Sequence, residues 1–399
     1  MAPCYQEIAL KRCQTASCLC QAIHNLAARK GRRHQTAGGA RQYRRGQHPA
    51  SANSSGETSV VSAHISRALQ RPEYPPRSGN RQAGRIRLLH GVQGLVLSGT
   101  IRALQYLGPA RCSDLGAMLA RTVGPVLSVS RIALDNLRIA FPEMAESSRD
   151  ALMRDAWDNL GRVVAEFPHL PNLGRTQDGP GWEIVGEECI AQAWQGGNPP
   201  LFFSAHLGNW EMILPIAGAL GLPVGGVYRR TSNPVIDRLI QGIRERAGSG
   251  TKMFPKGRQG ARAIIAHLSA GGTVGFLVDQ KMNDGIKIPF FGSPAWTAPA
   301  IAHLALRFER NIVPVSIVRI APARFRLVCE PALRIALSGN QKEDEVSIMS
   351  AINRHLEGWI SSRPSAWLWF HRRWPKGAPA DQGHHGAVHH GTARPSRSR

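Results

Sequence analysis

Short apolar runs alternate with helix-like segments between about residues 200 and 330, and this alternation most constrains the fold. The runs span residues 201–205, 224–227, 273–278, 312–320 and 325–329, lengths that are typical of buried strands. Apolar residues recur at helical spacing between them, and one such segment starts at Asn233 and Pro234, a capping residue and an early proline. Alternating strands and helices predict an α/β fold with a mixed, mostly parallel sheet flanked by helices.

Helical spacing also marks the region before the sheet. The segment 86–107 places its apolar residues on one stripe: Leu88, Val92, Leu95, Val96, Gly99, Ala103, Tyr106 and Leu107. The stripe predicts an amphipathic helix that either lies in a membrane interface or packs on the core. Further helical segments follow to about residue 170, so we expect helices to precede the sheet. No run of about 18 apolar residues is present, which argues against a transmembrane helix.

The formal net charge of the 399-residue chain is +23, which suggests an anionic partner: nucleic acid, an anionic membrane surface or a phosphorylated substrate. More than half of this excess lies in residues 1–85 and 376–399, which show no helical or strand period. We therefore expect a disordered basic extension and a disordered tail around one domain at 86–375. A nucleic-acid binder should interleave aromatic side chains with its arginines, and residues 1–85 contain only three tyrosines, so no nucleic-acid partner is expected. The four cysteines of that segment match no standard zinc spacing, and we expect no metal site.

One motif combines a histidine with a carboxylate at the end of a strand. His206 directly follows the run 201–205, and Glu211 comes five residues later. Sites in open α/β sheets gather at the carboxyl ends of strands. If Gly208 makes a tight turn, Glu211 can face the imidazole, fix its tautomer and leave the other nitrogen as a general base. Such a pair suits deprotonation of a hydroxyl, although an isolated pair at this spacing is more often a loop histidine that merely donates a hydrogen bond.

Three further groups of residues fit the same cleft. Arg229 and Arg230 follow the run 224–227, Asp279 and Gln280 end the run near 278, and Phe290 and Phe291 lie in a glycine-containing loop. The arginines suit a phosphate, the polar pair should point into the cleft, and the aromatic loop can cover an apolar chain. Each group taken alone also fits a plain role: a surface ion pair, a helix cap or a packing loop.

Taken in order, these motifs resemble the bacterial lipid A biosynthesis acyltransferases of the late lauroyl/myristoyl type, within the glycerol-phosphate acyltransferase superfamily. The resemblance covers about residues 86–375 and extends to further positions: Arg131, Asn136, Leu137, Phe141, Pro142, Glu166 and the closing run 369–374. The family's histidine and acidic residue correspond to His206 and Glu211, and its arginine corresponds to Arg229. Many members have proline at the next position, where this chain has Arg230.

The resemblance implies an O-acyltransferase that needs neither a metal nor a cofactor. The donor would be a thioester on acyl carrier protein, and the acceptor a hydroxyl of a phosphorylated lipid A precursor at the cytoplasmic face of the inner membrane. His206 would act as general base with Glu211 as its orienting partner, and backbone N–H groups near Gly208 or the Arg229 side chain would bind the oxyanion. Two alternatives stay open: an acyltransferase of the same superfamily acting on another glycolipid or a lysophospholipid, and a structural membrane protein whose site has decayed.

Overall fold

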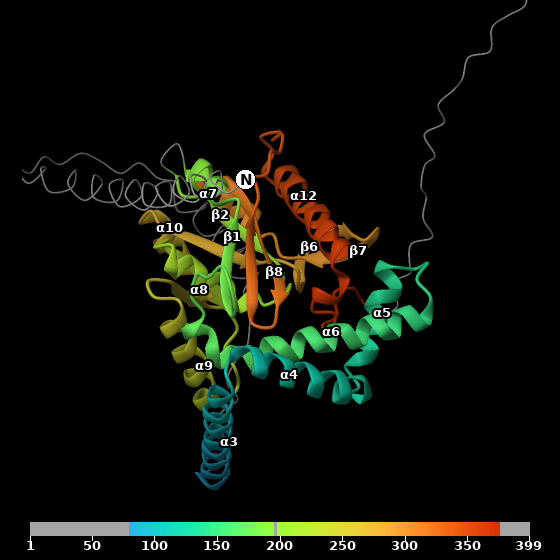
Figure 1. Cartoon of the computed structure of the whole chain (residues 1–399). Helices are drawn as coiled ribbons and strands as arrows, with labels where there is room; N and C mark the ends of the chain where they lie inside the picture. Colours follow the sequence, from blue (N-terminus) through green and yellow to red (C-terminus); the bar gives the residue numbers. More distant parts are fainter. Residues whose placement is uncertain (1–79, 195–197, 376–399) are drawn as a thin grey trace, which may run out of the picture.

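A seven-stranded sheet with the order β1-β9-β8-β2-β5-β3-β4 organises the protein (Figure 1). The computed structural model describes residues 80–194 and 198–375. The strands are β1 (Gly181–Val185), β2 (Leu201–Ser204), β3 (Val224–Tyr228), β4 (Lys252–Pro255), β5 (Thr273–Leu277), β8 (Ile312–Ala321) and β9 (Arg324–Cys329). Among the described strands of this sheet, only β8 and β9 pair in antiparallel fashion. The prediction of a mixed, mostly parallel sheet flanked by helices is confirmed.

The predicted basic extension, its cysteines and the C-terminal tail fall on residues 1–79 and 376–399, which lie outside the described residues. The first described helix, α3 (Asn80–Leu107), begins six residues before the expected domain start at residue 86. Sequence reasoning missed two edge strands, β1 and β4, because both are short and carry few consecutive apolar residues. The aromatic loop expected around Phe290 is instead the turn of an antiparallel hairpin, β6 (Lys281–Phe290) and β7 (Ser293–Thr297).

The central strand β2 explains why the sheet has helices on both faces. All four of its residues are buried, and successive side chains of a strand point to opposite faces. Phe203 packs in one core cluster with residues of α10 (Arg258–Ser269), α11 (Ala300–Phe308) and α12 (Gln341–Ser362). Phe202 packs in the other cluster with residues of α7 (Glu187–Trp194) and α8 (Ile213–Ala219). A strand that is apolar on both faces requires cover on both, which the alternating helices supply.

The connection from β3 to β4 shows how local sequence sets these helices. Helix α9 (Pro234–Ala247) begins where Asn233 Oδ1 accepts hydrogen bonds from the backbone N–H groups of Val235 (2.9 Å) and Ile236 (3.3 Å). The side-chain oxygen of Asn233 thus satisfies two amides that the first helical turn leaves unpaired. Gly248 ends the helix. The helix start predicted from Asn233 and Pro234 is confirmed.

From residue 80 onward, four helices and two short 3-10 turns precede the sheet. After α3 come α4 (Pro109–Val123), η1 (Gly124–Val126), α5 (Ser130–Ala140), α6 (Glu146–Glu166) and η2 (Phe167–Asn172). Helices α4 and α6 run side by side beneath the sheet (Figure 1) and cross where Gly116 faces Gly161. A Cβ atom on Gly161 would stand 2.1 Å from the Gly116 carbonyl oxygen, so the two backbones touch at this crossing.

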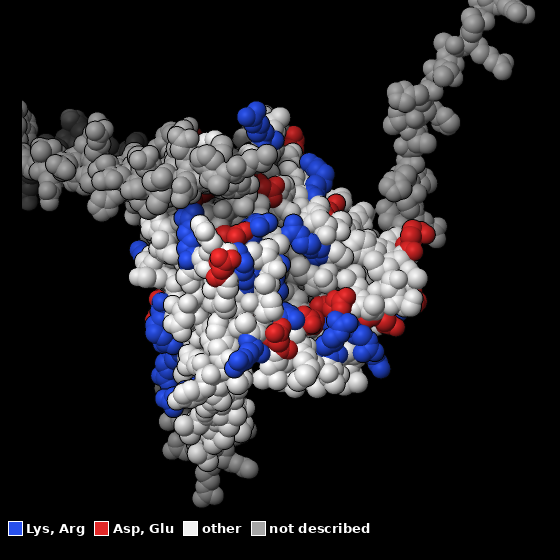
Figure 2. Space-filling model, in the orientation of Figure 1, with Lys and Arg blue, Asp and Glu red and all other residues white. Residues whose placement is uncertain are grey.

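Helix α3 projects from the body of the protein (Figure 1), and its apolar stripe is exposed. Leu95 is 75% exposed and Tyr106 is 91% exposed. Figure 2 shows the described part of this helix as a largely white surface. The stripe therefore does not pack on the described part of the protein. Within residues 80–194 and 198–375, no single helix has the length and hydropathy of a membrane span. The helical segments Pro109–Val126 and Ser130–Ala140 have that length and hydropathy only when they are taken together, and the pair is bent by 87°.

The α4–α6 crossing gives a direct test of this packing. Gly161→Ala should lower the free energy of unfolding by about 1–3 kcal/mol, because the added methyl overlaps backbone that cannot move aside easily. The matched control is Gly358→Ala in α12, where nothing lies within 4 Å of the added atom, so a gain of up to about 1 kcal/mol is expected from helix propensity. Denaturant unfolding measures both. Equal stability of the two variants would contradict a close helix crossing.

Candidate functional site

The ends of two neighbouring parallel strands bring a histidine and a carboxylate together. His206 follows β2 and Asp279 follows β5, and the two strands pair in parallel. His206 Nδ1 lies 2.8 Å from Asp279 Oδ1, and the backbone N–H of His206 donates to Asp279 Oδ2 at 3.0 Å. The Asp279 carboxylate therefore fixes both the imidazole and the chain that carries it.

Asp279 is fully buried and has further donors around it. The indole Nε1 of Trp367 donates to Asp279 Oδ2 at 2.7 Å. His371 Nε2 lies 3.3 Å from the Asp279 carbonyl oxygen. Burial opposes ionisation of Asp279, but the charge of His206 and the hydrogen bonds from it outweigh burial, so the pKa of Asp279 is well below its usual value. Asp279 is thus an ionised carboxylate that accepts hydrogen bonds.

The outer nitrogen of His206 faces the accessible side of this pair. An ionised Asp279 keeps the proton of the neutral ring on Nδ1, which leaves a lone pair on Nε2. The ring is 15% exposed, and the Gln280 side-chain amide lies 3.3 Å from Nε2. The indole of Trp210 stands edge-on to the imidazole at 5.1 Å between centroids. This arrangement can accept a proton from a hydroxyl placed at Nε2.

Glu211 does not face the imidazole, so the sequence-based pairing of His206 with Glu211 is wrong in its geometry. The chain continues from Gly208 into the 3-10 turn η3 (Trp210–Met212), which points Glu211 toward α9. Arg244 of that helix binds both carboxylate oxygens, with Nη2 2.6 Å from Oε1 and Nε 2.9 Å from Oε2. Spacing along the chain cannot reveal this, because Arg244 and Asp279 reach the motif from distant elements.

The loop after His206 is held rigidly by the segment that follows α12. Gly208 has φ +56°, and a Cβ atom there would stand 2.5 Å from the Ile317 carbonyl oxygen, so glycine is required. The Gly208 N–H donates to the Ala366 carbonyl at 3.0 Å, and the Leu368 N–H donates to the His206 carbonyl at 3.0 Å. The Gly208 amide already has an acceptor, so it is not free to bind an oxyanion, whereas the same expectation for the neighbouring Asn209 amide stays a prediction.

The remaining predicted site residues divide between the cleft and the core. Arg229 and Arg230 follow β3 at the same sheet edge, are exposed, and form no ion pair with another described residue. Phe290 is fully buried, with its ring centroid 5.9 Å from that of Trp367. Phe291 is half-buried and packs edge-on against Phe141. Phe290 is therefore a packing residue behind the site, which corrects the expectation that it covers an apolar chain. For the half-buried Phe291 that expectation stays a prediction.

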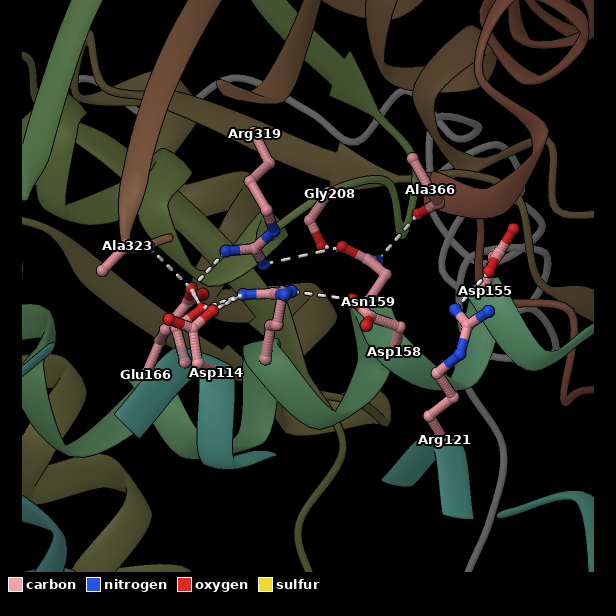
Figure 3. A network of polar contacts seen from close by, with 12 residues as sticks. Asp114, Arg121, Asp155, Asp158, Asn159, Glu166, Gly208, Arg319, Ala323 and Ala366 are labelled. Carbon is pink, nitrogen blue, oxygen red and sulfur yellow. Dashed lines mark hydrogen bonds and ion pairs between the residues drawn. The ribbon is translucent and has the colours of Figure 1, made fainter. Parts of the chain in front are cut away.

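A buried carboxylate on α6, Glu166, joins the helical layer to the loop after His206, and Figure 3 shows its contacts with Arg319 and Ala323. Glu166 is fully buried, and its Oε2 accepts a hydrogen bond from Asn209 Nδ2 at 2.8 Å. Its Oε1 accepts from Ser113 Oγ at 2.6 Å, from the Ala323 backbone N–H at 3.1 Å and from Arg319 Nη1. Sequence reasoning found Glu166 only through the resemblance and gave it no role.

The Asp279 partners Trp367 and His371 were not identified as site residues from the sequence. The only available signal was the aromatic run 367–374, read as the closing motif from residue 369 onward. Trp367, Trp369 and Trp374 are all buried, and Asn136 Nδ2 donates to the carbonyls of Trp369 (2.7 Å) and His371 (2.6 Å). This run is the inner wall of the site.

Comparison with known proteins places these residues in a family. A family model described as bacterial lipid A biosynthesis acyltransferase matches residues 84–376. The chain is 23% identical over 258 residues to the lipid A biosynthesis myristoyltransferase of Escherichia coli (strain K12), covering 63% of this chain and 77% of that protein.

Two further relatives agree with this match. Identity is 24% over 260 residues to lipid A biosynthesis acyltransferase 1 of Shigella flexneri, covering 63% of this chain and 77% of that protein. It is 24% over 274 residues to the lipid A biosynthesis lauroyltransferase of Escherichia coli (strain K12), covering 63% and 81%. Because the family model spans the sheet, the helices before it and the whole His206 site, the chain belongs to the bacterial lipid A biosynthesis acyltransferase family.

Proposed function

We propose that this acyltransferase moves a fatty acyl group from an acyl carrier protein thioester to a hydroxyl of a lipid A precursor. The observation that carries the proposal is the His206–Asp279 pair at the carboxyl edge of the sheet, in a chain whose relatives are named for lipid A acyl transfer. A histidine held in this way supplies the one proton acceptor that ester formation from an alcohol needs.

The chemistry follows from the two ring nitrogens. His206 Nε2 takes the acceptor's hydroxyl proton as the oxygen attacks the thioester carbonyl, while Asp279 stabilises the imidazolium through Nδ1. The carbon–oxygen bond forms, the carbon–sulfur bond breaks, and the proton passes from Nε2 to the leaving sulfur. The Gln280 amide, 3.3 Å from Nε2, is placed to donate to a substrate oxygen. No covalent enzyme intermediate is required.

Glu211 takes a positioning part in this proposal. Its ion pair with Arg244 ties the turn after His206 to helix α9, and both side chains are largely buried. Arg229 and Arg230, exposed at the end of β3, are suited to bind an anionic group of a substrate. Acceptors in the same superfamily, another glycolipid or a lysophospholipid, remain the alternative. An assay with thioesters of several acyl lengths against a lipid A precursor and a lysophospholipid decides between them.

The proposed location is the cytoplasmic face of the inner membrane, where acyl carrier protein is present. The support for it is the outward apolar stripe of α3, because an unpaired amphipathic face suits insertion at a lipid surface. Exposed apolar residues continue on α4 and η1, at Met118, Leu119, Val123 and Val126. Basic groups would add a salt-dependent attraction to anionic lipids.

The general-base role predicts that His206→Ala lowers the transfer rate by at least about 10²-fold while the protein stays folded. Glu211→Gln should act more mildly and through packing, because Glu211 contacts Arg244 and not the imidazole. Rates with the lipid A precursor, together with circular dichroism of each variant, measure this. A folded His206→Ala variant that keeps more than a tenth of the rate removes His206 from the mechanism.

If Asp279 stabilises the imidazolium of His206, Asp279→Asn should also lower the transfer rate by about 10²-fold or more, since the amide cannot stabilise an imidazolium. The free energy of unfolding gives an independent test of whether folding lowers the pKa of Asp279. The pKa of folded Asp279 is below its unfolded value of 3.8, so its contribution to stability is present above that pH and is lost as the pH falls further. The difference in unfolding free energy between wild type and Asp279→Asn should thus narrow from pH 7 to pH 3. A constant difference would mean that folding does not lower the pKa of Asp279.

The membrane proposal predicts that Leu95→Asp with Val96→Asp releases the protein from anionic vesicles, even where high salt alone leaves it bound. The matched control is Leu337→Asp with Val346→Asp, an exposed apolar pair away from α3, which should leave binding unchanged. Vesicle flotation with folding checked by circular dichroism measures both. A folded Leu95/Val96 variant that floats like wild type excludes α3 as the anchor.

A further inference from the structure

The segment that follows α12 contacts both members of the His206–Asp279 pair. The Leu368 N–H donates to the His206 carbonyl at 3.0 Å, and the Trp367 indole Nε1 donates to Asp279 Oδ2 at 2.7 Å. Leu207 and Trp367 also form an isolated antiparallel bridge. One segment therefore holds both the chain that carries the imidazole and the carboxylate that orients it.

Three contacts determine the rotation of the Asp279 carboxylate. Its Oδ1 lies 2.8 Å from His206 Nδ1, while its Oδ2 accepts the His206 backbone N–H at 3.0 Å and the Trp367 indole N–H at 2.7 Å. Hydrogen bonds to an ionised acceptor are stronger than neutral ones, and burial strengthens them further. Without the indole, Oδ2 would keep one donor, and the carboxylate would be freer to turn away from His206.

Other charged and titratable groups act on Asp279 without replacing this donor. Burial lowers the pKa of His371, so its ring is neutral at pH 7, and its Nε2 lies at the Asp279 carbonyl and not at the carboxylate. Burial lowers the pKa of Arg373 to about 10, so its guanidinium stays charged and attracts Asp279. Within the described part of the chain, Trp367 is the one side chain besides His206 that donates to the carboxylate oxygens.

The Trp367 side chain is itself held in one orientation. Its ring is 1% exposed and lies edge-on to the ring of Trp369, with the centroids 4.6 Å apart, and 5.9 Å from that of Phe290. The preceding carbonyl, of Ala366, accepts a hydrogen bond from Asn159 Nδ2 at 3.1 Å (Figure 3). Because the indole cannot move without opening the core, its N–H is a preorganised donor.

We propose that Trp367 is a positioning residue of the catalytic pair: its indole N–H fixes the rotation of the Asp279 carboxylate and sets how strongly that carboxylate holds a proton on His206. The inference rests on the proposed function, in which His206 is the general base. A carboxylate that loses one donor interacts more strongly with the imidazolium, so loss of the indole N–H should stabilise the protonated ring. The neutral ring, which accepts the hydroxyl proton, would then form only at higher pH.

The first test follows the His206 ring by NMR in histidine-labelled full-length protein, with His206→Ala to assign its signal. Trp367→Phe keeps an aromatic ring but loses the N–H, and the pH midpoint of the His206 titration should rise by about 0.5–1 unit. The matched control is Trp369→Phe, because this equally buried indole donates to the Pro364 carbonyl at 2.7 Å. That variant should leave the midpoint unchanged. Equal midpoints in wild type and Trp367→Phe, or equal shifts in the two variants, overturn the proposal.

A second substitution separates the hydrogen bond from the packing. Trp367→Gln places an N–H at the same number of bonds from Cβ as the indole does, but it removes the ring. The His206 midpoint should stay close to the wild-type value in Trp367→Gln and rise in Trp367→Phe, with folding checked by circular dichroism. A midpoint that rises equally in both assigns the effect to packing and overturns the proposal.

Wild-type protein gives a measurement that needs no folded variant. Protonation of the His206 ring draws the charge of the Asp279 carboxylate away from the indole, so the Trp367 Nε1–H resonance should shift with the same pH midpoint as the ring. A Trp367 resonance that stays constant through the His206 titration contradicts the proposed coupling.

Kinetics distinguish failure of this proposal from failure of the proposed function. With a lipid A precursor as acceptor, Trp367→Phe should lower kcat by about tenfold with little change in KM, because the buried indole supports the base and does not bind substrate. The acid limb of kcat/KM should move by the same amount as the ring titration. An active Trp367→Phe enzyme with the wild-type pH profile overturns the positioning role and leaves the function standing. Absence of transfer in wild type, with the NMR shift intact, overturns the function and supports the coupling of Trp367 to the pair.

Discussion

The buried Asp279 carboxylate is the interaction on which the site depends. It sits at zero exposure after β5 and accepts hydrogen bonds from the His206 backbone and the Trp367 indole, beside the His206 ring. A buried charge is tolerated only where such donors and an opposite charge compensate the lost hydration. The strand pairing of β2 with β5 brings these groups into register, and the aromatic run after α12 closes over them. The orientation of the imidazole is thus a consequence of the core and not of a flexible loop.

A second buried carboxylate, Glu166, supports the loop after His206 from the side of the helical layer. It joins α4, α6 and the β8–β9 turn to Asn209, in the loop that follows His206. The close crossing of α4 and α6 at Gly116 and Gly161 places this helix pair near enough for the contact. The helical layer therefore fixes the far side of the loop while the sheet fixes the near side. Rigid support on both sides suits the general-base role proposed for His206, because a catalytic group must be held within a fraction of an ångström.

Local sequence determined the strands β2, β3, β5, β8 and β9, the cap at Asn233, the preceding helices and His206 at a strand end, because periodicity and capping act within a few residues. It also identified Asp279 as a site residue, but as a substrate-binding group pointing into the cleft, whereas the structure buries Asp279 against His206. Only the tertiary structure decided which carboxylate contacts the imidazole of His206. Glu211 is five residues away yet turns to Arg244, whereas Asp279 is 73 residues away yet lies on the adjacent strand. Phe290 and the Gly208 amide were misjudged for the same reason: burial and hydrogen-bond partners come from segments distant in the chain, and no local pattern records them.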